Sequence, residues 1–152
     1  MTNNDCLRRI RYILDFDDSR MIAIFGLANC EVDRRQVSAW LKQDDNPDFE
    51  ECEDVMFASF LNGLIIALRG EREGGPPPAE KQLNNNIVFM KLKIALNLQA
   101  DEILETLASA GQLISKHELS AFFRRSDHKH YRECKDQILR NFLNGLRLQL
   151  RD

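Results

Sequence analysis

The sequence has no apolar segment that approaches the roughly 20 residues needed to cross a membrane. It also lacks a strong excess of one charge, since its 152 residues carry a net charge of −3. We therefore expect no membrane span and no strong overall attraction to nucleic acid or acidic lipid. Residues 1–16 contain neither a long apolar run nor a small-residue cleavage site, so we expect no secretory signal and predict a cytoplasmic protein.

Motifs that carry enzyme chemistry are also missing. No GxSxG surrounds Ser38 or Ser120, and no glycine-rich loop could cradle a phosphate. The cysteines form no CxxC pair, and without a secretory signal we expect reduced thiols rather than disulfides. They lie far apart in the sequence, at Cys6, Cys30, Cys52 and Cys134. These absences predict a protein that is not an enzyme, with no cofactor and no small-molecule substrate.

One short segment has the residue types of a metal site. His128 and His130 form an HxH pair beside Asp127, but Lys129 lies between the two histidines. A cation within the ligand set disfavours metal binding. We therefore predict no metal site.

What the sequence does contain is an internal repeat. The residues FLNGL occur at 60–64 and again at 142–146. Shifted by 82 positions, residues 3–70 align without a gap to residues 85–152, and 17 of the 68 pairs are identical. A gapless match of this length indicates a duplication.

The two copies are joined by a segment that cannot continue a helix. Residues 71–84 contain Gly74-Gly75 followed by three prolines, which end a helix and favour an extended, locally stiff chain. We predict a first helical repeat at 1–70, a linker at 71–84 and a second repeat at 85–152.

Each repeat is predicted to form four helices, giving an all-α protein. Apolar residues recur at helical spacing, and alternation of period two is almost absent. An asparagine is expected to cap the first helix, and capping boxes to begin the third, with Asp33 and Gln36 in one copy and Ser115 and Glu118 in the other. The predicted helices cover 3–15, 19–28, a third helix from 33, and 48–69, with equivalents at 85–97, 101–110, from 115, and 130–151.

The repeated glycine of FLNGL lies inside the predicted fourth helix. Glycine costs roughly 1 kcal/mol relative to alanine in a helix interior. Its presence at both Gly63 and Gly145 predicts that another backbone crosses closely there. Phe60, Leu61 and Leu64 are expected to face the core. Cys52 and Cys134 are placed by the same pattern on the apolar side of the fourth helix.

Helices two and three of each copy resemble a helix-turn-helix motif. Val32, Val37 and Trp40 have the spacing of the second half of that motif, in which the third helix enters the major groove. The turn is about two residues longer than the standard one, and ordinary helical hairpins produce the same spacing. The candidate nucleic-acid contacts are the basic residues Arg34, Lys42, Lys116 and Arg124.

The copies differ in charge and in one stripe of helix four. Residues 3–70 have 8 basic and 13 acidic residues (−5), whereas residues 85–152 have 11 and 8 (+3). The stripe is largely apolar in copy one and basic in copy two. The first-copy residues are Val55, Ala58, Asn62 and Ile65, and the second-copy residues are Arg140, Asn144, Arg147 and Arg151. At an offset of 82, Ala58, Asn62, Ile65 and Arg69 are equivalent to the latter four, and Val55 is equivalent to Gln137. An apolar stripe needs cover, so we expect Ile65 to be substantially buried, against copy two or a second subunit, and Arg147 to be exposed.

The Asn-Asn start of each copy, the run VSAWL at 37–41 and the doubled FLNGL resemble the bacterial YehS family. These are small proteins built from two copies of a domain of unknown function. The resemblance covers essentially the whole chain and implies a bacterial cytoplasmic protein, but no catalytic residues. Copy two departs from this family pattern, because it has LSAFF at 119–123 where copy one has VSAWL.

Two functional hypotheses remain. The favoured one is a non-catalytic interaction or regulatory protein that binds a protein partner, or forms a homodimer, through its helical faces. The other is a nucleic-acid-binding protein that uses helix three of each repeat and the basic face of repeat two.

Overall fold

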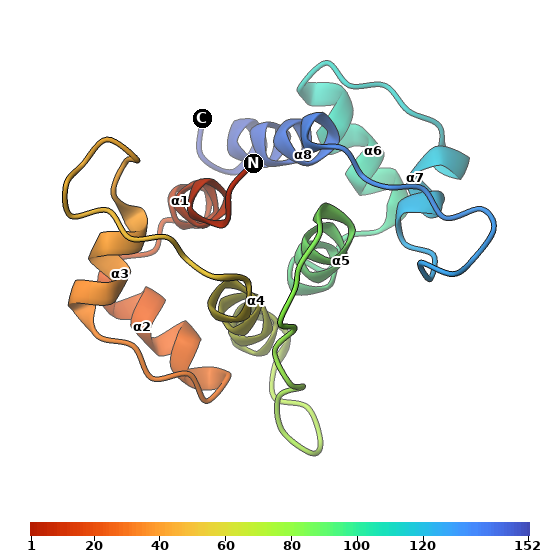
Figure 1. Ribbon diagram of the computed structural model, residues 1–152. Helices are drawn as coiled ribbons and strands as arrows, with labels where there is room; N and C mark the ends of the chain where they lie inside the picture. The colour runs from red at the N-terminus through yellow and green to blue at the C-terminus, as the bar shows by residue number, and fades with distance from the viewer. The chain divides into compact units, whose positions relative to one another are not determined.

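The computed structural model describes residues 1–152, which form eight helices and no strand (Figure 1). The chain divides into two compact units, Met1–Leu83 and Asn84–Asp152. Unit 1 contains α1 (Asn3–Ile13), α2 (Asp18–Leu27), α3 (Arg34–Leu41) and α4 (Asp54–Arg69). Unit 2 contains α5 (Asn85–Ala95), α6 (Ala100–Ser109), α7 (Lys116–Phe122) and α8 (Asp136–Leu150). The predicted all-α tandem repeat is confirmed. None of these helices has both the length and the apolar content to cross a membrane.

The helix ends follow the same rules in both units. Capping boxes begin α3 and α7, where the side chains of Asp33 and Ser115 accept from the backbone N–H three residues later. A residue in the left-handed region follows α1 and α5, namely Asp15 (φ +56°) and Asn97 (φ +53°). Such short polar side chains tolerate this conformation and terminate a helix.

The predicted asparagine cap of the first helix is wrong for copy one. Thr2 caps α1, and its hydroxyl accepts from the N–H of Asp5 at 3.1 Å. In copy two Asn84 caps α5, one residue before the Asn-Asn pair. That pair lies in the first turn of the helix in each unit, and its side chains reach a distant segment instead.

The predicted start of the fourth helix is also wrong. α4 begins at Asp54 and α8 at Asp136, six residues later than expected from the sequence pattern. The preceding residues are non-helical because the buried asparagine of the first helix binds their backbone, as described below. Cys52 and Cys134 therefore lie before the fourth helix rather than on it, although both are buried.

A compact apolar core lies inside each unit. In unit 1, Phe25 of α2 packs on Trp40 and Phe60, with ring centroids 5.4 and 5.3 Å apart. In unit 2, Phe89 of α5 packs on Phe122 and Phe142, at 6.3 and 4.6 Å. Phe60, Leu61 and Leu64 are fully buried, as predicted. Val37 is also fully buried and Trp40 is buried, whereas Val32 is only half-buried.

The close crossing at the repeated glycine is confirmed. A Cβ on Gly63 would lie 1.9 Å from the carbonyl oxygen of Ile24, on α2. A Cβ on Gly145 would lie 2.1 Å from the carbonyl oxygen of Thr106, on α6. Real Cβ atoms do not approach a backbone oxygen so closely, so only glycine lets the second and fourth helices of each unit pack at this distance.

Candidate functional site

The stripe on the fourth helix is divided between core and surface. Ala58 and Asn62 are buried, Ile65 is half-buried, and Val55 is 37% exposed. The expectation that Ile65 is substantially buried is therefore only partly met. The linker supplies cover within unit 1, because the carbonyl oxygen of Pro77 lies 3.4 Å from Asn62 Nδ2.

The equivalent stripe on α8 is basic and more open. Arg140, Asn144 and Arg147 are half-buried, and Arg151 is exposed. Arg147 keeps 44% of its side chain exposed and pairs with the Asp152 carboxylate. It is thus less exposed than predicted. The basic stripe is a half-open face with local ion pairing rather than a set of free cations.

The four candidate nucleic-acid contacts are either paired with a carboxylate or half-buried. Arg34 donates to the Ser19 hydroxyl at 2.9 Å and lies 3.6 Å from the Asp18 carboxylate, and Lys116 lies 3.5 Å from the Asp101 carboxylate. Each of these cations is thus partly neutralised by the preceding helix. Lys42 and Arg124 are half-buried and follow α3 and α7 instead of lying on them.

A different pair of segments stands out once the backbone is known. The segment between the third and fourth helices comprises residues 42–53 in unit 1, and the equivalent residues in unit 2, which follow Phe123, are 124–135. We call these the acidic loop and the basic loop. Both project from their units in Figure 1, where they are the gold loop after α3 and the blue loop after α7.

A buried asparagine anchors each loop to the first helix of its unit. Asn4 Nδ2 donates to the carbonyl oxygens of Trp40 (3.0 Å) and Glu50 (2.9 Å), and its Oδ1 accepts from the N–H of Cys52 (3.0 Å). The side chain uses three hydrogen bonds to hold both ends of the acidic loop. Because these partners are backbone groups, the anchor does not depend on the loop's own side chains.

Asn86 makes the same three bonds in unit 2. Its Nδ2 donates to the carbonyl oxygens of Phe122 (3.0 Å) and Arg132 (2.8 Å), and its Oδ1 accepts from the N–H of Cys134 (2.9 Å). The neighbouring asparagines repeat as well, since Asn3 and Asn85 each bind a cysteine carbonyl and the first aspartate of the following helix. The repeated Asn-Asn pair is therefore a loop anchor.

Inside the loops the hydrogen bonds also correspond. The N–H of Phe49 donates to Asn46 O at 3.0 Å, and the equivalent N–H of Tyr131 donates to His128 O at 3.0 Å. Even a side-chain bond is matched, because Asn46 Oδ1 accepts from Asp48 N and His128 Nδ1 accepts from His130 N. His128 thus takes part in the loop turn. The two loops share one backbone arrangement.

The charges on this common backbone are opposite. The acidic loop has one basic and six acidic residues, a net charge of −5, and the basic loop has five basic and two acidic residues, a net charge of +3. Outside the loops, residues 3–70 contain seven residues of each sign and residues 85–152 contain six of each. The loops therefore hold the entire net charge of each copy.

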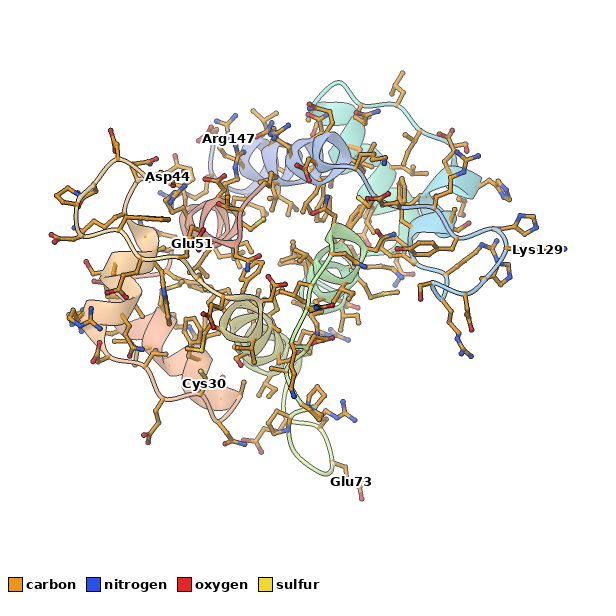
Figure 2. The ribbon with its side chains drawn as sticks, viewed as in Figure 1. Cys30, Asp44, Glu51, Glu73, Lys129 and Arg147 are labelled. Atoms are coloured by element: carbon orange, nitrogen blue, oxygen red, sulfur yellow. The ribbon has the colours of Figure 1, made fainter.

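Much of this charge is not neutralised within the units. In the acidic loop, Asp44 lies 3.9 Å from Arg8, and Glu50 lies 3.0 Å from Arg35. The exposed carboxylates Asp45, Asp48 and Glu51 form no ion pair. Asp44 and Glu51 are labelled on this segment in Figure 2.

The basic loop has two ion pairs of its own. Arg125 pairs with Asp127 at 3.3 Å and Lys135 with Glu133 at 3.2 Å, on side chains that are largely exposed. Lys129 and Arg132 are exposed and form no ion pair. Figure 2 shows Lys129 pointing outward from the tip of the loop. The charge count over whole copies predicted the contrast between them, but it did not place that contrast in these two loops.

A shallow depression of about 430 Å³ gives the acidic loop a concave side. Pro47 and Phe49 supply apolar surface there, and the carboxylates of Asp48 and Glu50 border it. Arg35, Ser38, Ala39 and Lys42 complete its lining. Glu50 is already paired with Arg35, so Asp48 is the carboxylate of this lining that remains without an ion pair.

The cysteines beneath the loops are not candidates for nucleophilic chemistry. Burial raises the pKa of the Cys52 and Cys134 thiols to about 12. Neighbouring negative charge, including Asp54 and Asp136 respectively, is a smaller contribution to the same rise in pKa. Burial also raises the pKa of Cys30. A reactive cysteine needs the opposite environment, one that stabilises the thiolate.

Comparison with known proteins agrees with the duplication. The family model described as "Protein of unknown function (DUF1456)" matches twice, at residues 3–70 and 85–152. The chain belongs to the DUF1456 family. It is 44% identical over 147 residues to "Uncharacterized protein YehS" of Escherichia coli (strain K12), an alignment that covers 96% of this chain and 94% of that protein. The DUF1456 matches start at the Asn-Asn pair in both copies, so each family domain contains one complete anchor and one loop. No solved structure matches the chain.

Proposed function

We propose that this protein is a non-catalytic, cytoplasmic interaction or regulatory module, which contacts its partners through charged surfaces held on a rigid helical frame. The observation that carries the proposal is the placement of all the net charge of each copy on one anchored, exposed loop. Electrostatic complementarity of this kind determines which partners associate and how fast. The raised pKa values of the buried thiols also favour a role without covalent catalysis.

Partner capture with loop variants tests this proposal. One variant neutralises the acidic loop (Asp45→Asn, Asp48→Asn, Glu51→Gln). A second neutralises the basic loop (Arg125→Gln, Lys129→Gln, Arg132→Gln). We expect each variant to lose a defined set of proteins that the wild type captures from the native host, because the charged contacts are gone.

A matched control changes charge outside the loops. Neutralising Glu31, Glu71 and Glu73, which are exposed and lie outside both loops, should leave the captured set unchanged. If both loop variants capture the same proteins as the wild type, in the same amounts, the proposal is wrong.

Nucleic-acid binding is a second candidate, favoured by the unpaired Lys129 and Arg132 and by the half-open basic face of α8. Phosphate contacts would make affinity fall steeply with salt. An electrophoretic shift assay at two salt concentrations, with wild type and the neutralised basic loop, checks this. A shift that is lost in the variant and at high salt would support nucleic-acid binding, and no shift in either protein would exclude it for the probes used.

A further inference from the structure

The two loops are complementary to each other, and both occur in the same polypeptide. They have matching hydrogen bonds and anchors, net charges of −5 and +3, and unpaired exposed side chains of opposite sign. The exposed carboxylates Asp45, Asp48 and Glu51 of the acidic loop form no ion pair, and Lys129 projects from the tip of the basic loop (Figure 2).

We infer that the acidic loop of one molecule binds the basic loop of a second copy of this chain, so that the protein associates head to tail. This inference rests on the proposed interaction function and names the partner. A second copy is a better partner than an unrelated acidic or basic protein because it carries both loops of opposite charge, and every molecule of the protein is present together with such a partner.

The geometry of such a contact determines the type of assembly. The two surfaces in the contact are different, so the interface is heterologous. A pair of molecules joined by one such contact still offers one free acidic loop and one free basic loop. Association then proceeds to open chains or to closed rings, the smallest of which is a pair of molecules joined by two reciprocal contacts.

The physical character of the contact is equally specific. The facing groups are exposed charges, which salt screens over a distance of about 10 Å at 0.1 M ionic strength. Self-association should therefore be weak, rise with protein concentration and fall on the order of tenfold or more when salt is raised. An apolar interface would not show this salt dependence.

Charge reversal in trans provides the test. One variant carries Asp45→Lys, Asp48→Lys and Glu51→Lys, which changes the acidic loop from −5 to +1. The other carries Arg125→Glu, Lys129→Glu and Arg132→Glu, which changes the basic loop from +3 to −3. The first variant then has two positive loops and the second has two negative loops.

Sedimentation velocity at low salt and several concentrations gives the readout. We expect the wild type to show a sedimentation coefficient that rises with concentration, each variant alone to lose that rise, and an equal mixture of the two variants to regain it. Circular dichroism confirms folding of each variant. If a reversal variant is unfolded, the neutral variants described above replace it and must also lose the rise.

Several results would overturn the inference. They are a wild type that stays monomeric at every concentration, variants that associate as the wild type does, or a folded mixture that stays monomeric. A monomer whose sedimentation coefficient changes with salt alone would indicate pairing of the loops within one chain, which also overturns it. Loop-dependent capture of host proteins without self-association would leave the proposed function intact and remove only this inference.

Discussion

The two copies use one backbone to present two different surfaces. Their loop anchors, capping boxes and helix crossings coincide residue for residue at an offset of 82. Their loops differ by eight units of charge. Hydrogen bonds and close contacts constrain the duplicated positions that hold the backbone. The exposed positions of the same loops are free of these constraints, so the charge of their side chains can differ in sign between the copies.

The cores of the two copies also differ, in a way that keeps their volume. Unit 1 has Leu7 on the first helix and Phe25 on the second, whereas unit 2 has Phe89 and Leu107 at the equivalent positions. All four side chains are fully buried. The phenylalanine has moved from one helix to the other while its aromatic neighbours on the third and fourth helices stay in place. A core tolerates such exchanges when total volume and pattern are kept.

The largest expected effect comes from removing the loop anchor. Asn4→Ala and Asn86→Ala each leave two carbonyl groups and one N–H without their partner, at a cost of roughly 1–3 kcal/mol for each group that stays buried. We expect a loss of at least about 3 kcal/mol in urea unfolding, similar in the two copies. Asn84→Ala, which removes only the exposed cap of α5, should cost about 1 kcal/mol. Unequal losses for Asn4 and Asn86 would show that the anchors are not equivalent.

The next effect concerns the close helix crossing. Gly63→Ala and Gly145→Ala place a Cβ against a backbone oxygen, and we expect each to destabilise by roughly 1–3 kcal/mol despite the gain in helix propensity. Gly26→Ala is the control, because its Cβ would meet nothing within 4 Å. It should gain up to about 1 kcal/mol. Copy two already has Ala108 at that position. A more stable Gly63→Ala or Gly145→Ala in urea would refute the close crossing.

A smaller effect distinguishes the two stripes on the fourth helix. Burying an isoleucine is worth roughly 1.5–3 kcal/mol, so Ile65→Arg at a half-buried site should cost about 1 kcal/mol. Arg147→Ile should change stability by no more than about 0.5 kcal/mol. Thermal unfolding measures both, and sedimentation shows whether Ile65→Arg also changes assembly. An Ile65→Arg variant equal to wild type in both would remove the α4 stripe as an interaction site.

Thiol labelling of the native cysteines compares how readily the two loops open locally, and it needs no substitution. Cys30 is half-buried and should react with a maleimide before the buried Cys52 and Cys134. The pKa of the Cys52 and Cys134 thiols is about 12 in the folded protein and 9.0 in the free thiol. Because the folded state holds these protons more tightly, the two thiols contribute to the free energy of unfolding below pH 9, and this contribution is lost as pH rises from 9 to 12.

We expect equal labelling rates at Cys52 and Cys134. A clearly faster rate at one of them would mean that its anchor opens more easily.

Much of the helical structure was predictable from the sequence, because the interactions that determine it involve residues close together in the chain. Capping boxes, helical periodicity and a glycine repeated inside an apolar helix each have a short-range cause, and all three were identified correctly. The start of the fourth helix was not, because Asn4 binds Glu50 and Cys52 across nearly fifty residues. A helical pattern between 48 and 53 does not reveal a hydrogen-bond partner that far away.

The candidate surface was predictable only in part. Counting charge over whole copies detected the contrast, but only the helix bounds showed that the contrast lies entirely in residues 42–53 and 124–135. Cations chosen by position in the motif, such as Arg34 and Lys116, proved to be paired with the preceding helix. Side-chain pairing of this kind depends on how helices cross, which periodicity does not specify.

The most direct test of the account exchanges the two loops within one chain, with residues 124–135 placed at 42–53 and the reverse. If both loops share one anchored backbone and the assembly depends only on their charge, the exchanged chain should keep the helix content of the wild type, unfold at nearly the same urea concentration and show the same concentration-dependent, salt-sensitive sedimentation. A chain with the acidic loop at both positions should fold equally well and stay monomeric. An exchanged chain that unfolds, or a double-acidic chain that associates as the wild type does, would contradict the central claim.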